Sequence, residues 1–179
     1  VLLTSAVTAS QRLSPVSYIG ANTFFFHQGE QISLTTLQKR LAAAGYANVK
    51  QVLAAGEFAV RGSIVDVFPM GSERPFRLDF FDDEIESIRW FDVDTQRSME
   101  SAEEIRLLPG HEFPVDPEAL LAFRQRWRRE FAGDPKKSIV YCDIEKEILP
   151  PGIEYYLPLF FDETAALTDY LPPNARVFL

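Results

Sequence analysis

The sequence has only one cysteine, Cys142, and only two histidines. A single cysteine cannot form a disulfide within the chain, and we therefore expect the reducing cytoplasm as its compartment. So few His and Cys side chains also exclude a zinc site built from four such ligands, and we expect no bound metal. Cys142 lies in an apolar run, and we interpret it as a small buried strand residue rather than as a nucleophile.

Long apolar segments are lacking too. The longest apolar runs, such as residues 157–161, are far too short to cross a bilayer, and we find no signal peptide, so we expect no contact with a membrane. The chain begins with Val1 rather than methionine, and we interpret it as a piece of a longer protein. Hydrophobic residues make up 46% of the sequence and include 15 phenylalanines, which predicts a folded core.

The signatures of common enzymes are missing as well. The sequence holds no GxxxxGK[ST] phosphate loop, no HExxH metal motif and no GxSxG nucleophile motif, so we expect no catalytic residues and no cofactor. The formal net charge of −8 disfavours a protein whose main task is to grip nucleic-acid phosphate. An acidic chain that exposes a few arginines more often binds another protein.

The middle of the chain predicts one helix followed by antiparallel strands. An apolar strand is expected before Gly29, Ser33 is placed to cap the following helix, and Gly45 to end it. The apolar face of this helix is made by Leu34, Leu37, Leu41 and Ala44. From residue 57 the apolar period becomes two, which predicts strands over residues 57–69, 76–81, 82–93 and 105–109. A helix packed on an antiparallel sheet is an α+β fold.

The two ends of the chain have a different character. Residues 1–22 start as a short apolar strand, and the stretch after Pro109 resembles a linker. We predict four elements after it, namely an amphipathic helix at 117–132, a strand at 138–144, a helix-like stretch at 163–170 and a strand at 175–179. Since strands and helices alternate here, we interpret this half as part of an α/β domain.

Two charged runs each permit a functional and a plain interpretation. The acidic run at residues 82–86 fits a solvated hairpin turn better than a metal or acid/base site, because Asp in a turn bonds its own backbone. The arginine-rich run at residues 124–129 surrounds Trp127. Since Trp127 belongs to the apolar stripe of its helix, we interpret the arginines as a solvated helix face, with nucleic-acid contact as the alternative.

The most informative residue is an arginine inside a predicted strand. Arg61 stands beside Gly62 in the run EFAVRGSIVDVFP, where a packed sheet would ordinarily hold another apolar side chain. We interpret Gly62 as a bulge that breaks the alternation of faces within one long strand.

The next predicted strand turns Arg77, Asp79 and Phe81 outward. Two arginines and a phenylalanine on one outward face have the composition of a protein-binding hot spot. In the alternative interpretation, Arg61 and Arg77 pair with Asp79 and Asp66 across the sheet, where exposed pairs contribute little stability. The pattern alone leaves both interpretations open.

Several motifs together resemble a known bacterial repair family. They are FAVRGSIVDVFP at 58–69, FRLDFFDDEIESIRWFD at 76–92, TQRS at 95–98, GIEYY at 152–156 and LTDYLP at 167–172. The first two are similar to strands of the excision-repair protein UvrB. Taken together, the motifs resemble the N-terminal UvrB-homology module of the bacterial transcription-repair coupling factors (Mfd), and the likeness covers nearly the whole chain.

The resemblance implies a division into domains and a partner. Residues 23–109 are similar to domain 2, through which both families bind UvrA, whereas residues 1–22 and 110–179 are similar to parts of a flanking helicase-like α/β domain 1. The implied function is a non-catalytic module that recruits UvrA, in competition with UvrB, to lesions where RNA polymerase has stalled. RNA polymerase and DNA would be contacted by other regions of the parent protein, an ATP-dependent DNA translocase.

The resemblance also implies which residues meet UvrA. They are Arg61, Gly62, Arg77 and Phe81, with Arg74 and Asp79 at the rim. A planar guanidinium suits bidentate pairing with a carboxylate on UvrA, and glycine permits the strand to bend or the partner to approach. The alternative function is that of a UvrB-like DNA- or nucleotide-binding fragment of a helicase-type ATPase.

Overall fold

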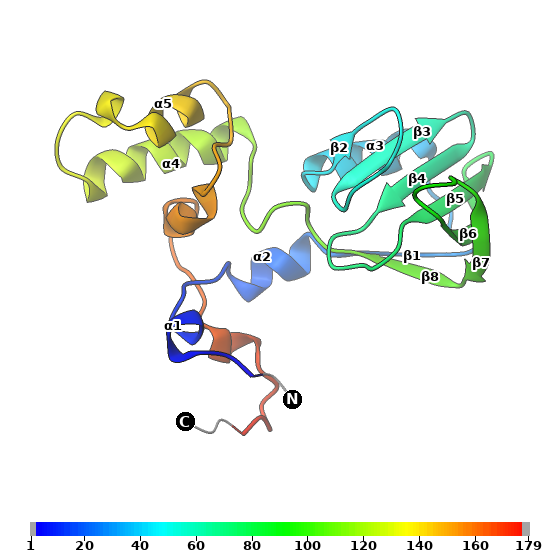
Figure 1. The fold of residues 1–179 in the computed structure, drawn as a ribbon, viewed down its shortest axis with the longest axis horizontal. Coiled ribbons are helices and arrows are strands. Elements are labelled where there is room, and N and C mark those ends of the chain that lie inside the picture. The colour runs from blue at the N-terminus through cyan, green and yellow to red at the C-terminus, as the bar shows by residue number, and fades with distance from the viewer. Residues whose placement is uncertain (1–2, 177–179) are drawn as a thin grey trace. The chain divides into compact units, whose positions relative to one another are not determined.

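The computed structural model describes residues 3–176 and divides the chain into two compact units (Figure 1). Residues 22–111 form the first, which contains the six-stranded sheet and is called the sheet unit below. The second is called the helical unit and comprises residues 1–21 and 112–179. Within the described part of the chain, no helix is both long and apolar enough to span a bilayer.

The sheet unit confirms the predicted α+β fold. Its strands are β1 (Phe24–His27), β2 (Ala47–Asn48), β3 (Glu57–Arg61), β4 (Ile64–Phe68), β5 (Phe76–Phe81), β6 (Glu84–Phe91), β7 (Ser98–Ala102) and β8 (Glu104–Leu107). Strands β2 to β7 make one sheet in chain order, antiparallel except for the short parallel pair of β2 and β3. β1 and β8 pair separately.

The helix α3 (Leu34–Ala43) covers one face of this sheet, as the apolar stripe predicts. The Ser33 hydroxyl caps it by accepting a hydrogen bond from the Thr36 N–H at 3.2 Å. Gly45 ends it with φ of 86°, a conformation that glycine adopts at little cost. Leu37 and Leu41, both buried, pack into the core with residues of β3, β4, β5 and β6, namely Phe58, Val65, Val67, Phe76, Leu78, Phe80, Ile85 and Ile88.

A buried tyrosine supports the loops of the sheet unit. The Tyr46 hydroxyl donates to the Leu108 carbonyl at 2.7 Å and accepts from the Met70 N–H at 3.1 Å. Burial raises the pKa of this phenol, although the Met70 hydrogen bond partly offsets the effect. The hydroxyl therefore joins two segments that are distant in sequence.

Tyr46→Phe is expected to lower the free energy of unfolding by about 1–2 kcal/mol, because two partly buried backbone groups lose their side-chain partner. Urea unfolding measures this difference. Tyr155→Phe is the matched control, since Tyr155 is 86% exposed and its replacement should leave stability unchanged. Equal stability of Tyr46→Phe and the parent would contradict the role of the hydroxyl.

One long predicted strand is in fact a hairpin. Residues 57–69 were expected to form a single strand with a bulge at Gly62, but β3 and β4 pair antiparallel and Gly62 and Ser63 form the loop between them. Gly62 has φ of 61°, and glycine at the first position of a two-residue loop is typical of a type II′ turn. The bulge interpretation is therefore wrong. Arg61 lies at the end of β3, where it faces Ile64 across the hairpin.

The helical unit differs from the predicted α/β pattern. Its elements are α1 (Ala6–Ala9), α2 (Val16–Ala21), α4 (Pro117–Glu130), α5 (Ile139–Glu145) and the 3-10 helices η1 (Pro135–Lys137), η2 (Ile153–Leu159) and η3 (Leu167–Tyr170). The predicted helix at 117–132 is confirmed as α4, which Asp116 caps by accepting from the Ala119 N–H at 3.0 Å. Of the stretch at 163–170, only η3 is helical.

The strand predicted at residues 138–144 is wrong, since this run forms α5. Ser138 caps the helix, and Tyr141 and Ile144, three residues apart, are its buried residues. Cys142 is accordingly a half-buried helix residue and not a buried strand residue. Strands were also expected at the two chain ends, where residues 1–2 and 177–179 lie outside the described residues. Ala175 and Arg176 belong to no strand.

Candidate protein-interaction surface

The sheet face opposite α3 carries most of the predicted site residues. Cross-strand partners point to the same side of a sheet, so the register places on this face Ala59, Arg61, Ile64, Asp66, Arg77, Asp79, Phe81, Arg89 and Phe91. We call it the outer face. The burial pattern of β5 confirms that Phe76, Leu78 and Phe80 point to the core, whereas Phe81 is exposed and Arg77 and Asp79 are half-buried.

A buried carboxylate occupies the middle of the outer face. Asp66, on β4, is only 1% exposed and lies between β3 and β5. It accepts a hydrogen bond from Arg61 Nη2, and Arg77 binds it bidentately through Nε at 2.7 Å and Nη2 at 2.9 Å. One carboxylate thus neutralises one of two guanidinium charges and holds both side chains in place.

Arg77 is enclosed by its partners. Its side chain is 13% exposed, and Nη1 donates to the Gln96 carbonyl at 3.2 Å and to Ser98 Oγ at 3.1 Å. The guanidinium also lies 5.0 Å from the centre of the Phe91 ring, within the range of a cation–π contact. The hydrogen bond to Asp66 raises the pKa of Arg77 in spite of its burial. Arg77 therefore mainly stabilises the outer face, and little of its charge is accessible to a partner.

Arg61 is the more accessible of the two arginines. Its side chain is 48% exposed, at the end of β3 beside the Gly62 turn. Asp79 lies in the same cross-strand row, two strands away, and accepts a hydrogen bond from Ser87 Oγ at 2.7 Å. Each of the two arginines pairs with Asp66, and neither pairs with Asp79. The cross-sheet pairing that the pattern left open is thus present in part, and Arg61 still offers half of its surface to a partner.

Phe81 is the exposed aromatic of the face. It ends β5, opposite Glu84, and is 68% exposed. Glu84 is engaged with Gln31, whose Nε2 donates to it at 2.7 Å. A phenylalanine with most of its ring in water gains little from folding, and such a ring becomes favourable when a partner covers it. Arg74 lies two residues before β5 begins and pairs with Glu100 at 3.6 Å.

Sequence reasoning left three contributors out of the predicted site. Asp66 was considered only as a possible partner, although it organises both arginines. Arg89, exposed on β6 beside Arg77, and Phe91, beneath the Arg77 guanidinium, were not singled out. The alternation of faces does place Asp66 outward between Val65 and Val67. The strand order, which brings it between the two arginines, cannot be deduced from that alternation.

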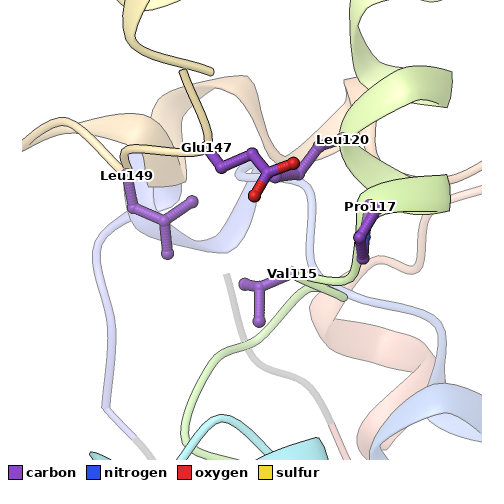
Figure 2. Close-up of a pocket in the computed structure, with 5 residues that line it drawn as sticks. All are labelled: Val115, Pro117, Leu120, Glu147 and Leu149. Carbon is purple, nitrogen blue, oxygen red and sulfur yellow. The ribbon is translucent and has the colours of Figure 1, made fainter. Parts of the chain in front are cut away.

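The acidic run at residues 82–86 and a pocket of the helical unit are weaker candidates for a functional site. Asp82 and Asp83 form the turn between β5 and β6, as predicted, and Glu84 and Glu86 lie on β6. Asp82 has φ of 52°. Within residues 3–176, no group of three or more His, Cys, Asp or Glu side chains is placed to hold a metal ion. Figure 2 shows a pocket in the helical unit, lined by Val115, Pro117, Leu120, Glu147 and Leu149. Four of its five lining residues have apolar side chains, and the fifth, Glu147, carries a carboxylate.

Comparison with known proteins supports the class that the fold and the outer face indicate, a protein-interaction module. The family described as the UvrB interaction domain matches residues 24–113, and the chain belongs to this family. It is similar to transcription-repair-coupling factors, with 46% identity to that of Escherichia coli K12 over 97% of this chain, 50% to that of Haemophilus influenzae over 92%, and 32% to that of Bacillus subtilis over 99%. The resemblance found in the sequence is thereby confirmed. The chain spans only 14% to 16% of the length of these relatives.

Proposed function

We propose that the sheet unit is a non-catalytic module that binds UvrA through its outer face. Membership in the UvrB interaction domain family supports a partner among the excision-repair proteins. The observation that carries the proposal is that an exposed aromatic, Phe81, and a half-exposed arginine, Arg61, lie on the same braced sheet face. Aromatic and arginine side chains contribute most of the energy of many protein interfaces.

The predicted site residues then have different tasks. Phe81 inserts into an apolar recess of UvrA, and Arg61 pairs with a carboxylate there. Arg77 holds the face together through Asp66, and Gly62 keeps the β3–β4 turn tight beside Arg61. Arg74 and Asp79 form the rim, on which contacts contribute less.

The biological role follows from this contact. The module recruits UvrA, and with it nucleotide excision repair, to lesions at which RNA polymerase has stalled. The names of the similar proteins, transcription-repair-coupling factors, support this role. No step of this recruitment requires catalysis by the residues of this chain. The module acts in the cytoplasm.

Competition with UvrB tests the proposal. The chain is expected to bind immobilised UvrA, and added UvrB should displace it completely, because both would occupy the same face of UvrA. Biolayer interferometry measures both steps. Simultaneous binding of UvrB and this chain to one UvrA would contradict a shared site, and the absence of any binding to UvrA would contradict the proposed function.

A further inference from the structure

The helical unit carries a concentration of positive charge that the proposed function does not use. Residues 124–137 contain six arginine or lysine residues and two acidic residues, a net charge of +4 in a chain whose total is −8. The remaining residues therefore carry −12. A segment with charge of the opposite sign to the rest creates a local field that attracts polyanions.

The structure separates engaged cations from accessible ones. Arg126 is 17% exposed and donates to Asp162 at 2.6 Å and to the Leu159 carbonyl at 3.2 Å, so it is a structural residue. Arg129 pairs with Glu130 at 2.8 Å. By contrast, three exposed residues make no ion pair with any described residue, namely Arg128, Lys136 and Lys137. We call these three the basic patch.

The basic patch gathers around one turn of α5. The Arg128 guanidinium lies 5.6 Å from the centre of the Tyr141 ring. The next residue, Cys142, donates through Sγ to the Lys136 carbonyl at 3.3 Å. The end of α4 and the backbone of η1, which carries the two lysines, therefore both contact the Tyr141–Cys142 part of α5, and Figure 1 shows α4 and α5 packed side by side.

An exposed aromatic ring adjoins the patch. Phe131 caps the end of α4, three residues after Arg128, on the same side of the helix. It is 45% exposed, and its ring is supported by Trp127 at 4.6 Å and by Tyr156 at 6.3 Å between ring centres. A ring that is fixed by other rings and open on one side can stack on a flat ligand.

We propose that the basic patch and Phe131 bind single-stranded nucleic acid, with phosphates on the three cations and a base stacked on the ring. Lys and Arg clusters that contain exposed aromatics are typical of single-strand binding, because every base offers a face for stacking. An acidic protein segment would satisfy the cations but would leave the ring unused. The inference departs from the expectation that only other regions of the parent protein contact nucleic acid, and it does not depend on UvrA.

Fluorescence anisotropy with labelled oligothymidylate tests the proposal on the whole chain. Lys136→Glu/Lys137→Glu is expected to weaken binding at least about tenfold and to reduce the slope of log K against log salt by about 1.4, because two phosphate contacts are lost. Lys39→Glu/Arg40→Glu is the matched control. It makes the same change of charge on exposed residues of α3 and should bind like the parent.

Phe131→Ala separates stacking from phosphate contact. This variant is expected to bind about tenfold more weakly with an unchanged salt slope, whereas Phe25→Ala, at a similarly exposed ring of β1, should have no effect. Three results would overturn the proposal: no binding of the parent at low salt, equal losses in the α3 control, or equally tight binding of polyglutamate. The last result would assign the patch to an acidic protein instead.

Discussion

Asp66→Ala is expected to lower the free energy of unfolding of the sheet unit by about 3 kcal/mol. The carboxylate is almost fully buried, and its removal leaves the enclosed Arg77 guanidinium without its main partner. Most of the loss comes from Arg77, because Arg61 is half-exposed and water can solvate its charge. Urea unfolding and the hydrogen exchange of the β4 and β5 amides measure the effect.

Two further variants make this prediction specific. Asp79→Ala removes the same side chain from the same face, but Asp79 is less buried and bonded to Ser87, so we expect a loss of about 1 kcal/mol or less. Asp66→Leu/Arg77→Met is expected to recover much of the stability, since apolar residues can replace a buried ion pair. If Asp66→Ala unfolded like the parent, the carboxylate would not brace the face.

Phe81→Ala is expected to weaken binding to UvrA at least about tenfold, or about 1.4 kcal/mol, while stability stays unchanged. The ring is mostly in water when the chain is alone, so the folded chain loses little when it is removed. Isothermal titration against purified UvrA measures the change, and melting curves verify the fold.

Arg61 gives a complementary test of the same interface. Arg61→Lys keeps the charge but loses the planar fork, and we expect it to bind UvrA nearly as weakly as Arg61→Ala if the partner offers a carboxylate. A lysine variant that bound like the parent would show that charge alone is recognised. Binding by Phe81→Ala at parental affinity would remove the ring from the interface.

The sequence predicted the sheet unit well because its elements carry strong local signals. The Ser33 cap, the apolar stripe from Leu34 to Ala44 and the Gly45 stop all indicated one helix, and alternation in 76–81 indicated which side chains of β5 point outward. The strand β7 was not predicted. Its sequence, SMESA, is almost wholly exposed and has no buried face to produce alternation.

Two errors have identifiable physical causes. Gly62 and Ser63 separate two apolar runs and fit a type II′ hairpin, a signal present in the sequence but interpreted as a bulge. The run at 138–144 is short and apolar, and periodicity alone cannot tell a buried strand from a helix at that length. Packing decides the outcome, because Tyr141 and Ile144 lie on the side of α5 that joins the core of Trp127 and Phe123.

The arrangement of the candidate site could likewise be predicted only in part from the sequence. The alternation of side chains along the strands correctly predicted that Arg61, Arg77 and Phe81 share one face of the sheet. Alternation gives no information, however, on which strands are neighbours. β4 lies between β3 and β5, so a carboxylate of β4 takes both arginines. The enclosure of Arg77 also depends on Gln96, Ser98 and Phe91, which no alternation pattern brings to it.

One titration tests the central claim most directly, with UvrA against the parent and two double variants. Arg61→Ala/Phe81→Ala removes the arginine and the ring from the outer face. Phe25→Ala/Arg106→Ala removes the same two residue types from an exposed cross-strand pair of β1 and β8. The account predicts that the first variant, still folded, loses binding at least about a hundredfold and that the second binds like the parent. Equal affinity of both variants for UvrA would contradict it.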